Sequence, residues 1–122
     1  MKAAYVFRVT FRLDADGVSL DPDRFETTME IPAAEPGDDG WLRFRDRLWR
    51  GEIGDEPSMR RDASERLGVD VEAIAFSELR TDEAYLDGLK RAIADDLDAF
   101  NADSVDEVLH KYLGSSIHVR ER

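Results

Sequence analysis

Residues 3–13 read AAYVFRVTFRL, and their pattern sets the fold class of the chain. Every second side chain is apolar, while Arg8, Thr10 and Arg12 occupy positions between them. Successive strand side chains point to opposite faces of a sheet, so this period of two predicts a strand with one buried face. The inward set is Ala3, Tyr5, Phe7, Val9, Phe11 and Leu13.

Three further strands are predicted along the rest of the chain. Residues 24–31 (RFETTMEI) alternate in the same way, and a turn at residues 14–17 separates them from the first run. We expect the two runs to form an antiparallel pair. Residues 73–80 (AIAFSELR) predict a third strand, and residues 116–120 predict a fourth.

Four helices are predicted between these strands. The first covers residues 41–50, and the second begins at Asp55 and ends at Gly68. A long third helix follows Thr81, and an S-x-x-E capping box at Ser104 begins the fourth. The order ββααβααβ predicts a single α+β domain over residues 1–122, with an antiparallel sheet of about four strands and helices on one face.

The charge of the chain predicts its environment. Its 122 residues carry 28 Asp and Glu against 17 Lys and Arg, a net charge of −11. Asp outnumbers Glu by 17 to 11 and Arg outnumbers Lys by 14 to 3, which favours salt adaptation, although a GC-rich genome would give a similar bias. Cys is absent, and neither a signal peptide nor an apolar run of membrane-spanning length is visible. We therefore expect a cytoplasmic domain that does not bind membranes.

The segment WLRFRDRLWR, residues 41–50, is the most unusual local feature. It holds four Arg, one Asp and three aromatic residues, a local charge of +3. As a helix it would place its aromatic residues on one apolar arc, which contains Arg45 as well. The candidate contacts for a partner or an anion are Arg43, Arg47, Trp49 and Arg50. The alternative is that the segment is structural. The aromatic rings would then belong to the core, and the Arg50 guanidinium would bind a carboxylate of the same chain through two hydrogen bonds.

The longer sequence GWLRFRDRLWRGE, residues 40–52, resembles the haloarchaeal family of LWR-salt proteins. That family takes its name from the tripeptide found here as Leu48-Trp49-Arg50 and from its salt-loving hosts. The resemblance implies a small acidic domain from a saline habitat. It implies no activity and no catalytic residues.

A buried ion pair is the other candidate site. Asp96 lies about 20° from Leu89 on the predicted long helix, within the apolar arc. If Asp96 is buried it needs a partner, and Arg45 is the candidate; otherwise both lie at the edge of the surface. The chain's two histidines, His110 and His118, belong to different elements. We therefore expect no metal, cofactor or catalytic constellation.

Three functions remain open. The first is a non-enzymatic interaction or regulatory module, with a possible homo-oligomer through the outer sheet face around Arg8, Thr10, Arg12 and Thr28. The second, a nucleic-acid or phosphate-binding protein that uses residues 41–50, is less favoured because counterion release weakens as salt rises. The third is an enzyme with an Asp/Arg site of unrecognised pattern.

Salt should stabilise this chain. Repulsion among its 28 carboxylates is relieved by screening, so we expect the melting temperature to rise between about 0.1 and 2 M KCl. Circular dichroism melts across that range measure the effect. A flat or falling curve would contradict the salt-adapted interpretation.

Overall fold

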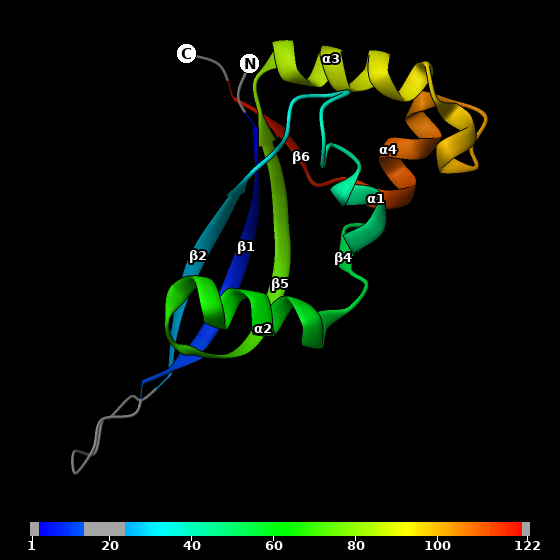
Figure 1. Cartoon of the computed structure of the whole chain (residues 1–122). Helices are drawn as coiled ribbons and strands as arrows, with labels where there is room; N and C mark the ends of the chain where they lie inside the picture. The colour runs from blue at the N-terminus through cyan, green and yellow to red at the C-terminus, as the bar shows by residue number, and fades with distance from the viewer. Residues whose placement is uncertain (1–2, 14–23, 121–122) are drawn as a thin grey trace.

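The computed structural model describes residues 3–13 and 24–120, and its centre is a four-stranded sheet (Figure 1). The strands are β1 (Ala3–Arg12), β2 (Arg24–Pro32), β5 (Asp70–Thr81) and β6 (Ile117–Val119), in the spatial order β2-β1-β5-β6. Strand β1 pairs antiparallel with both β2 and β5, but β6 runs parallel to β5. The α+β class is confirmed. The predicted turn at residues 14–17 lies outside the described residues.

The prediction of an antiparallel sheet is wrong at β6. Between β5 and β6 the chain runs through α3 (Glu83–Ala94), the 3₁₀ helix η1 (Leu97–Phe100) and α4 (Val105–Leu113). A crossover of this length can carry the chain back to the starting end of the neighbouring strand, so β6 enters the sheet in the direction of β5.

The first half of the chain contains an additional hairpin. Helix α1 (Arg43–Arg47) leads into the strands β3 (Leu48–Trp49) and β4 (Glu52–Ile53), and α2 (Glu56–Leu67) follows. The predicted order ββααβααβ is therefore not confirmed as stated, because β3 and β4 stand between the first two helices. Figure 1 shows α2 across the lower part of the sheet and α3 across its upper end.

Local signals explain where the helices begin and end. The Asp55 carboxylate accepts the N–H of Ser58 at 3.2 Å at the start of α2, and Gly68, at φ 70°, ends it. Asp82 rather than Thr81 caps α3. Ser104 caps α4 by accepting the N–H of Glu107 at 3.2 Å.

Strand β5 extends beyond the predicted residues 73–80 at both ends. Two bulges interrupt the alternation of its side chains, so the sequence pattern does not show its full length. Its register against β1 shifts between Val6 and Phe7 and again between Thr10 and Phe11, leaving Ser77 and Glu72 without partners in β1. Each bulge inserts one extra residue, so the inward side chains are not evenly spaced. They are Val71, Ile74, Phe76 and Leu79.

One core lies between the sheet and the helices. Tyr5, Phe7 and Val9 of β1 are buried in the same cluster as Met59 and buried residues of the other helices. The helix contributions are Met59 and Ala63 of α2, Tyr85, Leu89 and Ile93 of α3, and Val108, Leu109, Tyr112 and Leu113 of α4. The helices therefore cover the inner face of the sheet.

The substitution Leu89→Ala tests this core. Leu89 is buried in α3, so its truncation should lower the free energy of unfolding by about 2–5 kcal/mol. Lys90→Ala is the matched control on the exposed side of the same helix and should change it by less than about 0.5 kcal/mol. Urea denaturation of both variants at high salt measures the difference. Equal stabilities would show that α3 does not cover the core.

Candidate interaction site

Residues 41–50 do not form the predicted single helix. The helix α1 ends at Arg47, and Leu48 and Trp49 form β3, which pairs with Ile53 and Glu52. The two residues between the strands have positive φ, 52° for Arg50 and 79° for Gly51. This is the dihedral signature of a two-residue hairpin turn of type I′, in which Gly is favoured.

The hairpin turn is hydrogen-bonded to the end of α4. The backbone N–H of Arg50 donates to the carbonyl of Lys111 at 2.8 Å, and that of Gly51 to the carbonyl of Tyr112 at 3.0 Å. Carbonyls in the last turn of a helix have no partner within the helix, so the turn satisfies two of them. The backbones also approach closely, because a Cβ atom on Gly51 would lie 3.1 Å from the carbonyl oxygen of Leu113.

The side chains of Leu48, Trp49 and Arg50 each make contacts within the chain. Leu48 is buried in the core. The Trp49 ring is 48% exposed and packs edge-on against Tyr112, with centroids 5.9 Å apart. The Arg50 guanidinium and the Lys111 ammonium each lie 5.8 Å from the Trp49 ring centre, within the range of a cation–π interaction. Within the described part of the chain Arg50 forms no ion pair, so its observed partner is an aromatic ring rather than a carboxylate.

The structure does not bring Arg45 and Asp96 together. Arg45 binds Asp46 at 3.1 Å and donates to the carbonyl of Ala99 at 3.2 Å. The Asp96 side chain is exposed, because α3 ends at Ala94 and the helical arc used to place Asp96 is broken there. The surface-edge alternative describes both positions better than a buried pair.

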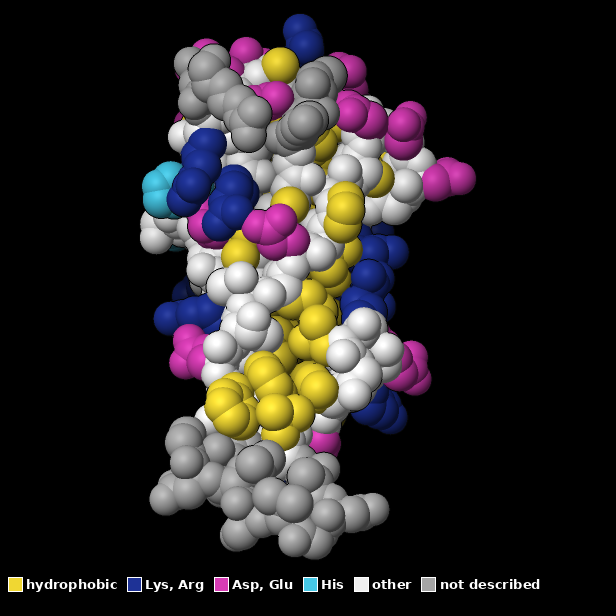
Figure 2. All heavy atoms as spheres, turned by 90° about the vertical axis from the view of Figure 1, so that its left-hand side faces the viewer, with side chains coloured by type: hydrophobic (Ala, Val, Ile, Leu, Met, Phe, Trp, Pro, Cys, Tyr) yellow, Lys and Arg dark blue, Asp and Glu magenta, His cyan; other side chains and the backbone are white. Residues whose placement is uncertain are grey.

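The four candidate contact residues fall in two places. Trp49 and Arg50 lie against α4, whereas Arg43 and Arg47 border a groove of about 420 Å³ between β2, α1 and α2. The groove has an apolar floor, and Figure 2 shows apolar side chains running along it beside basic ones. The floor residues are Tyr5, Phe7, Met29, Ile31, Phe44, Leu48 and Met59.

Charged side chains form the rim of this groove. They are Arg43, Arg47, Arg66, Asp62 and Glu65, so the rim has a formal charge of +1 in a chain of net charge −11. Arg47 is paired with Asp62 at 3.3 Å. Among the described residues neither Arg43 nor Arg66 forms an ion pair. Within residues 3–13 and 24–120, the groove thus has two guanidinium groups without an ion pair beside an apolar floor.

The Tyr5 phenol in the floor stays protonated. Burial raises its pKa well above the usual value, Tyr85 raises it further, and only the nearby Arg43 opposes the shift. The Tyr5 side chain therefore adds no charge to the floor of the groove.

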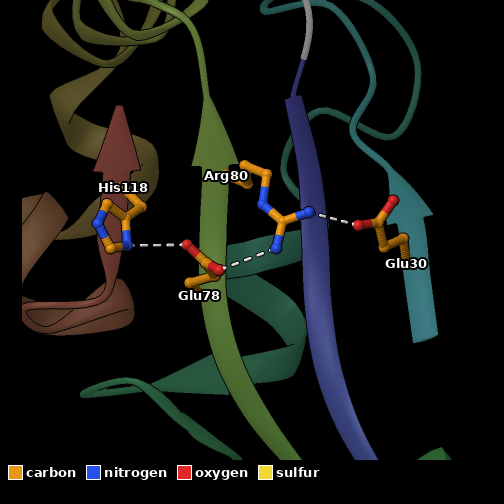
Figure 3. Close-up of polar contacts among 4 residues, drawn as sticks. All are labelled: Glu30, Glu78, Arg80 and His118. Atoms are coloured by element: carbon orange, nitrogen blue, oxygen red, sulfur yellow. Dashed lines mark hydrogen bonds and ion pairs between the residues drawn. The ribbon is translucent and has the colours of Figure 1, made fainter. Parts of the chain in front are cut away.

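A ladder of charged side chains crosses the outer face of the sheet (Figure 3). Arg80 of β5 binds Glu30 of β2 at 2.6 Å and Glu78 of its own strand at 3.1 Å. Glu78 also lies 3.0 Å from His118 of β6. The ladder explains why Val6 is only 2% exposed although it faces outward, since in register Val6 lies between Glu30 and Glu78.

A second bridge crosses the lower part of the same face. Glu72 binds Arg24 at 2.8 Å and lies 4.0 Å from Arg12. Sequence analysis missed both bridges, because each one joins strands whose register the sequence does not show. Arg12, one of the residues predicted for an oligomer contact on this face, is thus already engaged within the chain.

The residues that the structure describes offer neither a metal site nor a membrane-spanning helix. They contain no group of three or more His, Cys, Asp or Glu side chains placed to hold a metal ion. No helix among them combines the length and apolar character needed to cross a membrane.

The fold and the contacts of residues 41–53 define a small acidic α+β domain whose β3–β4 hairpin is hydrogen-bonded to its last helix. The sequence model of the LWR-salt protein family matches residues 1–122, so the chain belongs to that family. Searches of curated proteins and of solved structures found no match.

The substitution Gly51→Ala tests the close packing of the hairpin turn against the end of α4. Positive φ costs a non-glycine residue about 1–2 kcal/mol, and the contact with Leu113 should add about 1–3 kcal/mol. Gly40→Ala is a matched control, because Gly40 has a similar φ of 85° but open space at the Cβ position. We expect Gly51→Ala to melt at a lower temperature than Gly40→Ala. Equal losses would mean that the close approach does not matter.

Proposed function

We propose that this chain is a salt-adapted, non-enzymatic interaction module of a haloarchaeal cytoplasm, and that its groove binds an extended protein segment with acidic and apolar side chains. The observation that carries the proposal is the pair Arg43 and Arg66, which flank the apolar floor without an ion pair among the described residues. Carboxylates of the partner would bind these guanidinium groups, and its apolar side chains would cover the floor.

High salt favours this mode of binding. At molar ionic strength the Debye length is about 3 Å or less, so recognition depends on groups in direct contact. Contacts between guanidinium and carboxylate groups, together with apolar burial, meet that condition.

The position of the arginines supports this proposal over the two alternatives. A nucleic-acid surface would use residues 41–50 as one patch. Instead the Trp49 ring packs on Tyr112 of α4 and the Arg50 guanidinium lies over Trp49, while Arg43 and Arg47 border the groove. An enzyme with an Asp/Arg site would need arginine and carboxylate side chains that are not already bound to each other. Arg47, Arg24 and Arg80 are instead each bound to a carboxylate that joins two elements.

Binding of short synthetic peptides tests the proposal. Peptides that alternate Leu or Phe with Asp or Glu should bind in about 2 M KCl, and matched peptides with Lys in place of the acidic residues should not. The double variant Arg43→Glu/Arg66→Glu should lose at least about tenfold in affinity, or about 1.4 kcal/mol. Fluorescence anisotropy with labelled peptides measures this.

A matched double variant provides the control. Arg61→Glu/Arg91→Glu makes the same change of charge at exposed residues outside the groove and should keep the affinity. Circular dichroism melts check that both variants are folded. If a single-stranded oligonucleotide binds instead, and the groove variant abolishes that binding, the nucleic-acid alternative replaces the proposal.

A further inference from the structure

Strand β2 has no neighbour on one of its two edges among the strands that the structure describes. It is the terminal strand of the sheet, and on both of its faces residues 24–28 are exposed. This edge lies near the centre of the surface seen in Figure 2, since β2 forms the left side of the sheet in Figure 1. An edge strand presents N–H and C=O groups that another strand can pair with.

The hydrogen bonds between β1 and β2 show which residues of β2 direct their backbone N–H and C=O groups to the open edge. The N–H of Ala33 donates to the carbonyl of Ala3 at 3.0 Å, and this pair continues the β1–β2 register. In antiparallel pairing, hydrogen-bonded and non-hydrogen-bonded pairs alternate. The odd-numbered residues of β2 therefore bond to β1. The even-numbered residues direct their backbone groups to the open edge, and they are Arg24, Glu26, Thr28 and Glu30.

Like charges, the missing N–H of Pro32 and short overlap each argue against other ways of pairing β2 with a second copy of itself. A two-fold axis at Thr28 would place Glu26 opposite Glu30, and an axis at Glu26 would place the two Glu26 side chains opposite each other. Like charges directly opposite are destabilising. An axis at Met29 would set Glu26 against Pro32, which has no N–H to donate. An axis at Phe25 would overlap only residues 24–26 of the two described strands.

A two-fold axis at Thr27 avoids all three problems. It pairs residues 24–30 of the two copies, it places no like charges directly opposite each other, and it needs no N–H from Pro32. It places Arg24 opposite Glu30 of the second copy, Glu26 opposite Thr28, and Phe25 beside Met29 on the inner face. Phe25 is one of the exposed large apolar residues, at 36%, so the pairing would bury apolar area as well.

We infer that β2 pairs antiparallel with β2 of a second copy about a two-fold axis at Thr27, which makes one continuous sheet from the two copies. The ion pairs of the outer face would then continue across the axis. Arg24, already bound to Glu72, would meet Glu30 of the second copy, which is bound to its own Arg80. The inference goes beyond the proposed groove function and does not depend on it.

Salt should control this assembly. Each copy carries a charge of −11, and the repulsion between copies falls as ionic strength rises. The monomer should therefore predominate at low salt and the dimer at high salt.

Cysteine crosslinking tests the register directly, because the chain has no native Cys. Thr27→Cys would place two thiols in a non-hydrogen-bonded pair on the axis, with Cα atoms about 4.5 Å apart, which is within disulfide range. Thr28→Cys is the matched control, since each Cys would lie opposite Glu26. We expect Thr27→Cys to form a covalent dimer under mild oxidation in about 2 M KCl, and Thr28→Cys to crosslink much more slowly. Equal rates, or faster crosslinking of Thr28→Cys, would overturn the inference.

Charge exchange tests the same register by sedimentation velocity. Arg24→Glu should raise the dimer dissociation constant at least about tenfold, and Arg24→Glu/Glu30→Arg should restore it. Arg8→Glu, on the outer face but away from the edge, should have no effect. A dimer broken by Arg8→Glu alone would place the contact on the outer face, and a monomer at all salt concentrations would also refute the edge pairing. Peptide binding by the groove is measured separately, so failure here leaves that proposal standing.

Discussion

Two backbone hydrogen bonds from the turn at Arg50 and Gly51 to the last turn of α4 join a hairpin of the first half of the chain to the last helix of the second half. They fix the hairpin β3–β4, and through it the preceding helix α1. Phe44 of α1 can then stack on Phe100, with centroids 5.7 Å apart, and pack against Tyr112. Since Arg43 belongs to the same short helix, its place on the rim of the groove depends on an aromatic cluster that includes Phe100 and Tyr112 of the C-terminal half.

Features encoded by neighbouring residues could be predicted from the sequence. The alternation of β1 and β2, the Asp55 cap and Gly68 end of α2, and the Ser104 cap of α4 all depend on side chains within a few positions of each other. The direction of β6 could not be predicted in this way, because it depends on the path of a crossover through three helical segments. The prediction for residues 41–50 failed for a related reason: their apolar spacing fits a helix, but the carbonyls that stabilise the turn belong to α4.

The candidate site was predictable to a smaller extent. The enrichment of arginine in residues 41–50 identified Arg43 and Arg47, which border the groove, but Arg66 carries no signal that distinguishes it from other helix arginines. The ladder from Glu30 to His118 required the register of three strand pairs. Side chains that alternate along one strand are visible in a sequence, whereas partners across strands are visible only once the strands are aligned.

The two bulges of β5 constrain how this family can change in length. Without the extra residue at Ser77, every position on one side of it would be carried to the opposite face, placing Glu78 among core residues or Phe76 in solvent. The same holds at Glu72. Deletions within β5 would therefore be tolerated only in compensating pairs. In an alignment of relatives we would expect insertions and deletions to collect in the connecting loops, while the length of β5 stays constant even where its residues vary.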